Sequence, residues 1–133
     1  MENIHLDIKP KVVTLTITRE HVGNMFDLSM IHAMTQHIHT VSTDAYCIVI
    51  RGAGADFCRG RDPSTAGAHP TPMALRDNLL LPIMDLYDAI KSSKIPVIAV
   101  VQGQALGLGC AIAGVCDITI ADEGALFQLP QMQ

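Results

Sequence analysis

The residues of this sequence best suited to chemistry lie in two glycine-rich segments, each of which follows an apolar run. Residues 52–62 follow the run 46–51, and residues 103–109 follow the run 96–101. A strand that ends in a turn of small residues leaves main-chain N–H groups without partners, so that they can point at a ligand oxygen. If the fold brings two such turns together, they polarise one carbonyl from two sides. This pattern indicates acyl chemistry performed by the main chain.

Other glycine-dependent sites fit the sequence less well. Residues 52–57 superficially resemble a dinucleotide-binding fingerprint, but the third glycine is missing and no acidic residue closes a following strand at the right distance. Residues 103–109 lack the Lys-Ser/Thr pair of a phosphate-binding P-loop, and the chain has no Gly-x-Ser-x-Gly elbow. A nicotinamide-dependent dehydrogenase is therefore the weaker interpretation.

The histidines and cysteines do not form a recognisable metal site. His32 and His39 are seven positions apart on a predicted helix, about 10 Å, which is too far for both to bind one metal ion. Cys110 stands at the start of another predicted helix and is a candidate nucleophile, although a small residue packed into the turn is the better interpretation. The four cysteines show no Cys-x-x-Cys spacing, and we expect them to be reduced thiols (Cys47, Cys58, Cys110 and Cys116).

Composition limits the class of protein. The chain has 133 residues, enough for one domain with a buried core, and 49% of them are hydrophobic. The net charge of −4, with no basic stripe, argues against nucleic acid as a partner. The apolar stretch 95–120 is interrupted by Gln102, Gln104 and Asp117, so we expect no membrane span. Without an apolar stretch behind a basic start, we predict a cytoplasmic location.

Strands and helices are predicted to alternate along the chain. Residues 4–8 and 12–18 alternate apolar with polar positions and predict a hairpin. Asp27 is the predicted N-cap of a helix that continues to about residue 42. Short β-branched runs predict buried parallel strands at 46–51 and 96–101, and a further strand at 117–121. Two more helices are predicted, at 73–93, with a kink or a new start at Pro82, and at 106–115. This order predicts an α/β fold with parallel pairing.

The two turns and their surroundings resemble the signatures of the crotonase superfamily, the enoyl-CoA hydratase/isomerase family. The motifs are Phe-Cys-Arg-Gly-Arg-Asp at 57–62 and Gly-Gln-Ala-Leu-Gly-Leu-Gly-Cys at 103–110. Supporting matches are Gly-Asn-Met-Phe at 23–26, Ile-Pro-Val-Ile-Ala at 95–99 and Cys-Asp-Ile at 116–118. No single motif is decisive, but together they cover nearly the whole chain in the order typical of the family.

The resemblance implies a ββα spiral in which residues 1–133 are the N-terminal part of a single crotonase-like domain. It implies an acyl-CoA thioester as the ligand, with coenzyme A as part of the substrate and no separate cofactor. It also implies a homo-oligomer, a trimer or a dimer of trimers. A usual member is about twice as long, so we expect this chain by itself to be truncated, to expose apolar surface, and to aggregate or depend on a partner.

The same resemblance assigns roles to residues of the two turns. The main-chain N–H groups of Arg61 and Leu108 would form an oxyanion hole that stabilises a thioester enolate, shaped by Gly60, Gly107 and Gly109. Since only the main chain acts, the chemistry does not fix the side chains of Arg61 and Leu108. The residues implied to bind the substrate, including the adenine end of coenzyme A, are Cys58, Arg59, Gly60, Asp62, Pro63, Gly103 and Ala105. Arg19, Arg59 and Arg61 are considered as phosphate contacts, and solvated surface charge is an equally good interpretation of them.

Two positions depart from the pattern of hydratases in this family. The first glutamate of the family falls at Ala111, and the second falls at Gln131. Neither residue transfers a proton, so the reaction is left open among hydration, isomerisation and hydrolysis. Asp77 and Asp85 are considered as replacement acids, although surface carboxylates are the better interpretation of both. The alternative function is a non-catalytic CoA-binding or assembly protein.

Overall fold

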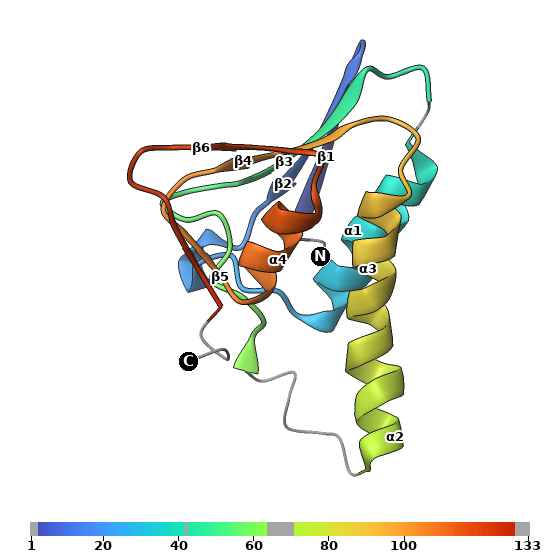
Figure 1. Ribbon diagram of the computed structural model, residues 1–133, viewed down its shortest axis with the longest axis vertical. Helices are drawn as coiled ribbons and strands as arrows, with labels where there is room; N and C mark the ends of the chain where they lie inside the picture. Colours follow the sequence, from blue (N-terminus) through green and yellow to red (C-terminus); the bar gives the residue numbers. More distant parts are fainter. Residues whose placement is uncertain (1–2, 42, 64–70, 130–133) are drawn as a thin grey trace.

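The centre of the computed structural model, which describes residues 3–41, 43–63 and 71–129, is a five-stranded sheet in the order β1-β2-β3-β4-β6 (Figure 1). Strands β1 and β2 form an antiparallel hairpin, and β2, β3, β4 and β6 are parallel. This confirms the predicted α/β fold and its parallel pairing. The strands are β1 (Ile4–Lys9), β2 (Val12–Ile17), β3 (Cys47–Gly52), β4 (Val97–Val101) and β6 (Ile118–Ala121).

The core lies between one face of this sheet and three helices. The register places Val13 beside Ile48, and Ile48 beside Val97, and all three side chains are buried. Each such burial contributes roughly 1.5–3 kcal/mol. The helices that complete the core are α1 (Leu28–Thr40), α3 (Leu81–Lys91) and α4 (Leu108–Val115).

Strands β3 and β4 are buried on one face only, which corrects the prediction of buried strands at 46–51 and 96–101. On the opposite face Val49, Ile98 and Val100 are half-buried and Arg51 is exposed. In the described part of the chain, the helices pack against the face of the sheet that carries the buried side chains (Figure 1).

Helix α1 begins where the sequence predicted. The side chain of Asp27 accepts a hydrogen bond of 2.9 Å from the N–H of Met30, as an N-cap does. The helix ends at Thr40, two residues before the predicted boundary, and it buries Met30, Ile31, Met34 and Ile38.

The helix predicted at 73–93 is one continuous element that changes its winding before Pro82. It starts as α2 (Pro72–Leu75), widens into the π-helical segment η3 (Arg76–Leu80) and continues as α3. The N–H of Leu81 reaches back five residues to the carbonyl of Arg76. A proline ring clashes with the carbonyl four residues before it, and a wider turn gives that carbonyl room. The expected interruption therefore takes the form of a π-segment.

Three short elements were not predicted. Strand β5 (Gln104–Leu106) pairs in parallel with β7 (Leu126–Gln128), and the 3-10 turn η1 (Glu20–Val22) follows β2. Because residues 104–106 are extended, the helix predicted from residue 106 begins instead at Leu108.

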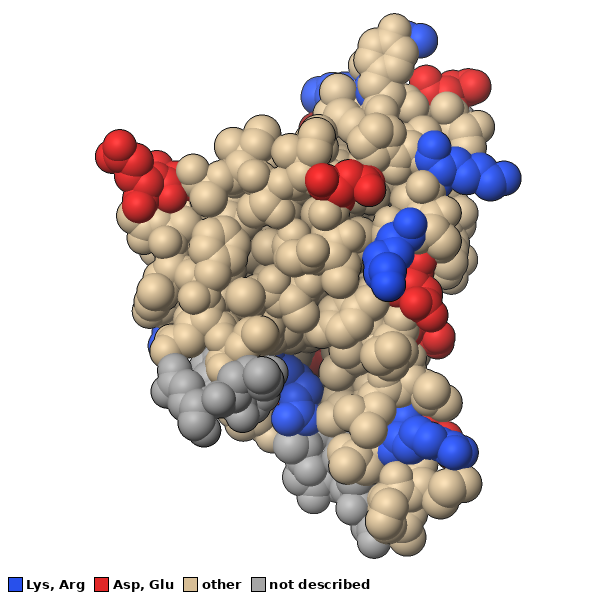
Figure 2. Space-filling view, viewed as in Figure 1, with Lys and Arg blue, Asp and Glu red and all other residues tan. Residues whose placement is uncertain are grey.

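Strand β6 forms an exposed edge of the sheet. All four of its residues are exposed, and Ile120 keeps 56% of its surface accessible. Apolar Leu126 and Phe127 on β7 are exposed as well. Figure 2 shows that the centre of the face over α4 and β6 carries no charged side chain. An exposed, uncharged surface of this kind is typical of an interaction surface.

Candidate functional site

The fold brings the two glycine turns into direct contact. Cys58, in the first turn, forms a parallel bridge with Ala105 in β5. The N–H of Cys58 donates to the carbonyl of Gln104 over 3.1 Å, and the N–H of Leu106 donates to the carbonyl of Cys58 over 2.9 Å. The two segments therefore run side by side from their strands to their glycines.

Glycine is required where the turns meet. Gly60 has a φ of +107°, and a Cβ on it would lie 3.1 Å from the carbonyl oxygen of Leu106 and 3.9 Å from the nitrogen of Leu108. Gly107 has a φ of +54°. Side chains rarely tolerate such backbone conformations, so these two glycines allow the main chains to approach one another.

The two N–H groups singled out by the sequence lie at this junction. Leu108 is the first residue of α4, where N–H groups have no partner within the helix. Gly60 and Asp62 exchange main-chain hydrogen bonds with Phe26, and in such a bridge the N–H of Arg61 points away from Phe26. Among the described residues, neither Arg61 N–H nor Leu108 N–H has an acceptor. Neither N–H is therefore occupied by a described residue.

A pocket of about 400 Å³ opens at this junction. Helix α3 contributes Ile83 and Tyr87 to it, and α4 contributes Leu108 and Ala111, where the resemblance puts the first family glutamate. Within the described residues, no carboxylate lines the pocket. Its lining consists of Arg59, Gly60, Arg61, Ile83, Tyr87, Leu106, Gly107, Leu108 and Ala111.

The carboxylates considered as replacement acids lie elsewhere. Asp77 is exposed and accepts a 3.0 Å hydrogen bond from its neighbour Arg76. Asp85 borders a different hollow, between α1 and α3, together with His32. Gln131 lies outside the described residues. Neither aspartate reaches the junction of the turns.

Three predicted site residues, Gly103, Ala105 and Gly109, pack against neighbouring main chain and do not line the pocket. Ala105 is fully buried. A Cβ on Gly109 would overlap the carbonyl oxygen of Cys58, and one on Gly103 would overlap that of Ala55. The side chain of Leu108 is only 8% exposed and belongs to the core, so Leu108 has a packing role besides the role predicted for its main chain.

The charged residues of the first turn divide into two groups. Arg59 and Arg61 line the pocket. Asp62 forms an ion pair of 2.9 Å with Arg19, and both side chains are mostly buried. Arg19 also donates a hydrogen bond to the carbonyl of Met25, so its guanidinium links the chain just after β2 to the segment before α1. Pro63 is exposed at the edge of a described segment.

Two side-chain amides, one buried and one half-buried, hold the first turn in place, and the sequence analysis did not assign them this role. Asn24 is fully buried, and its Nδ2 donates to the carbonyls of Ala53 over 2.8 Å and Asp56 over 2.9 Å. Gln102 Nε2 donates to the carbonyl of Gly52 over 2.8 Å. The available signals were the place of Asn24 in the motif at 23–26 and the position of Gln102 between an apolar run and a glycine. These bonds satisfy loop carbonyls that would otherwise be costly to bury.

The thiol of Cys58 is closed off beneath the pocket. Its side chain is fully buried, and its sulfur accepts a weak hydrogen bond from the N–H of Gly60 over 3.4 Å. Burial raises the pKa of the Cys58 thiol to about 12, and the Gly60 contact opposes this only in part. Cys58 is therefore a packing residue and not a nucleophile.

This environment predicts slow modification of Cys58. With a pKa of about 12, its thiolate fraction at pH 8 is on the order of 10⁻⁴, and the folded chain shields the sulfur. In the native protein at pH 8, we expect a disulfide reagent to label half-buried Cys47 and Cys110 before Cys58, as measured by peptide mass spectrometry. Denatured protein, in which all four cysteines should react alike, is the control. Rapid labelling of Cys58 in the native protein would contradict its placement.

Two further classes of site can be described briefly. Residues 3–41, 43–63 and 71–129 contain no cluster of three or more His, Cys, Asp or Glu side chains arranged to hold a metal ion. No helix in these same ranges combines the length and the hydropathy needed to cross a membrane.

Comparisons with known proteins agree on one family. The sequence profile described as "Enoyl-CoA hydratase/isomerase" matches residues 7–133. A probable enoyl-CoA hydratase of Rhodobacter capsulatus is 32% identical over 93% of this chain and 48% of its own length. The 2,3-dehydroadipyl-CoA hydratase of Escherichia coli is 27% identical over 99% of the chain and 51% of its own length. The chain thus spans about half the length of these relatives.

Solved structures share the fold. The crystal structure of an enoyl-CoA hydratase from Mycobacterium smegmatis superimposes with a TM-score of 0.86 at 28% identity, over 94% of this chain and 49% of that one. A Legionella pneumophila protein described as an enoyl-CoA hydratase/isomerase (crotonase) gives a TM-score of 0.87 at 30% identity, over 94% of this chain and 49% of that one.

Proposed function

Because the chain belongs to the enoyl-CoA hydratase/isomerase family of the crotonase superfamily, we propose that it binds an acyl-CoA thioester at the junction of its two glycine turns. The thioester oxygen accepts hydrogen bonds from the N–H groups of Arg61 and Leu108. The observation that carries this proposal is the meeting of Gly60 with Leu106 and Leu108 beside a pocket.

Two such donors favour the charged state of the thioester over its ground state. Negative charge develops on the oxygen when an enolate forms, and a preorganised donor is worth more to that charge than to the neutral carbonyl. The position of Leu108 at the start of α4 adds the positive end of a helix dipole. Charge stabilisation of this kind serves hydration, isomerisation and hydrolysis alike.

Residues around the donors supply binding contacts. We assign Arg59 and Arg61, which line the pocket, to the phosphates of coenzyme A. Asp62 and Pro63 extend the same turn toward the adenine end. Cys58, Gly103 and Ala105 act by holding the turns, since Cys58 and Ala105 are fully buried and Gly103 packs against Ala55. A trimer and a cytoplasmic location stay predictions.

A second function, CoA binding without turnover, is favoured by one observation. Ala111 lines the pocket where a hydratase of this family has a glutamate, and the described lining holds no carboxylate. The protein would then bind the thioester and stabilise charge on its oxygen, but it would have no side chain to transfer a proton.

Calorimetry and a hydration assay separate these functions. We expect butanoyl-CoA to bind and to raise the melting temperature, because a ligand that binds only the native state stabilises it. NAD, the control ligand, should leave the melting temperature unchanged. Turnover of crotonyl-CoA would support the enzyme, and binding without turnover would support the second function. If butanoyl-CoA fails to bind, both are wrong.

A further inference from the structure

Tyr87 is the one neutral side chain with a hydrogen-bonding group in the described lining of the pocket. It lies one helical turn after Ile83 on α3, so the two side chains share a face of that helix. The remaining lining consists of arginines, main-chain donors and the apolar residues Leu106, Leu108 and Ala111. The ring of Tyr87 packs against the core, while its residue is only partly buried.

The hydroxyl of Tyr87 has no hydrogen-bond partner within the described residues. Burial, followed by the nearby thiols of Cys110 and Cys58, raises the pKa of this phenol above its ordinary value of 10.0. The hydroxyl of Tyr87 therefore keeps its proton at neutral pH. It can donate a hydrogen bond to a ligand in the pocket. A tyrosine hydroxyl usually has a hydrogen-bond partner where it is buried, and a ligand that fills this pocket would bury the hydroxyl of Tyr87.

We propose that Tyr87 is a specificity-determining residue whose hydroxyl donates a hydrogen bond to an oxygen of the acyl chain beyond the thioester carbonyl. This inference rests on the proposed function, since it takes the acyl group to lie in the same pocket. It adds that the site prefers acyl groups with a hydroxyl or keto oxygen over plain alkyl chains of the same length. The main-chain N–H groups bind the thioester carbonyl, and the hydroxyl of Tyr87 binds an oxygen farther along the acyl group.

The placement of Ala111 supports this assignment. It follows Leu108 by three residues, about one turn of α4, and lines the same pocket as Tyr87. A methyl group there leaves space that a larger side chain would fill. The acyl chain can therefore extend from the donors at the start of α4 along the gap between α4 and α3, where Tyr87 stands.

A thermodynamic cycle tests the proposal. Calorimetry would give the dissociation constants of butanoyl-CoA, 3-hydroxybutanoyl-CoA and 4-hydroxybutanoyl-CoA for the native protein and for Tyr87→Phe, which removes only the oxygen. If the hydroxyl makes a neutral hydrogen bond, Tyr87→Phe should raise the dissociation constant of at least one oxygenated ligand by about 3- to 10-fold. The dissociation constant of butanoyl-CoA should change little. The coupling, and not the single loss, is the quantity that a purely structural role would not produce.

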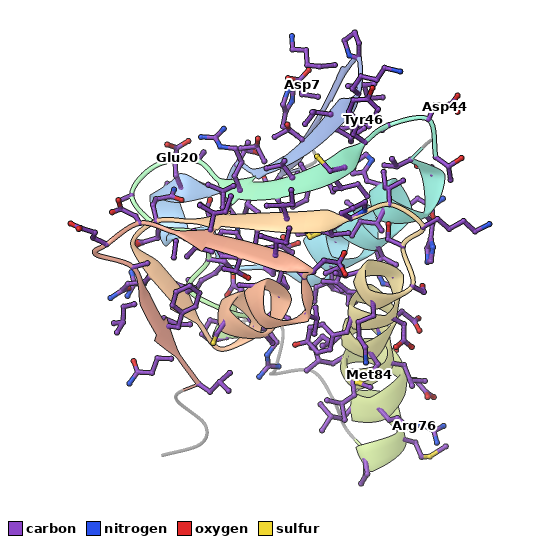
Figure 3. All side chains as sticks on the ribbon, turned by 45° about the horizontal axis from the view of Figure 1, so that its top comes forward. Asp7, Glu20, Asp44, Tyr46, Arg76 and Met84 are labelled. Atoms are coloured by element: carbon purple, nitrogen blue, oxygen red, sulfur yellow. The ribbon has the colours of Figure 1, made fainter. Side chains whose placement is uncertain are left out.

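Tyr46→Phe is the matched control. The chain has two tyrosines and no tryptophan, and Tyr46 is 67% exposed, with Lys11 Nζ 5.1 Å from its ring centre. Figure 3 shows it beside the β1–β2 hairpin, away from Met84 on α3. This variant should leave all three dissociation constants unchanged. Because Tyr87 is then its one tyrosine, its tyrosine fluorescence should come from Tyr87 alone.

The outcomes separate the two proposals. If Tyr87→Phe changes all three ligands by the same factor, or none of them, the role of Tyr87 is wrong while acyl-CoA binding stands. If none of the three ligands binds the native protein, the proposed function fails and the role of Tyr87 fails with it.

Discussion

Replacing Leu108 with proline should lower turnover of acyl-CoA by about 10²–10³-fold, the cost of losing one oxyanion donor. Proline lacks the N–H that we assign to the thioester oxygen. Its ring is well tolerated at the first position of a helix, and Leu108 is the first residue of α4. The substitution therefore removes the donor with little disturbance to the helix.

The matched control is Leu108→Ala. Both variants lose a side chain that is 8% exposed, so both should lose stability, by roughly 2–5 kcal/mol for the alanine variant. They differ mainly in the N–H, and the ratio of their kcat values isolates the donor. If the protein binds CoA without turnover, the same ratio is measured on the affinity for an enolate analogue. Equal loss in the two variants, each shown to be folded by circular dichroism, would count against a main-chain oxyanion hole.

The sequence was sufficient for the fold because its strongest signals are local. Alternating residues predicted the β1–β2 hairpin, Asp27 predicted the start of α1, and the order of strands and helices predicted parallel pairing. Strand β5 escaped prediction because three residues show no periodicity, and its partner β7 lies about twenty positions later. Pairing over that separation depends on tertiary contacts that local patterns do not encode.

The site was predictable only in part, for a similar reason. Glycine is needed where two main chains approach, and Gly60 and Gly107 could be singled out from sequence alone. The contribution of α3 could not, because it depends on how that helix is rotated against α4. From the sequence, Tyr87 cannot be distinguished from other residues of an amphipathic helix. Its place in the pocket follows from the packing of α3. Asn24 was quoted only as part of a motif, since its hydrogen bonds cross to residues about thirty positions away.

The missing carboxylate can be restored, and this is the second large effect that we expect. Ala111→Glu places a carboxyl group in the lining of the pocket, at the position of the first family glutamate. A positioned acid or base contributes typically about 10²–10⁴-fold to a rate. We expect the lower end, about 10²-fold in kcat for crotonyl-CoA hydration, because the second glutamate position is still Gln131.

Ala111→Gln separates proton transfer from shape, because glutamine matches glutamate in size but does not titrate in this range. If Ala111→Glu gains hydration activity and Ala111→Gln does not, the reacting carbons lie beside α4 and the oxyanion hole is competent, so that this chain needs only an acid to hydrate. If both variants bind butanoyl-CoA as tightly as the original chain and neither gains activity, the acyl group does not pass Ala111. The path between α4 and α3 that we assign to it would then be wrong, even with the thioester oxygen correctly placed at Leu108.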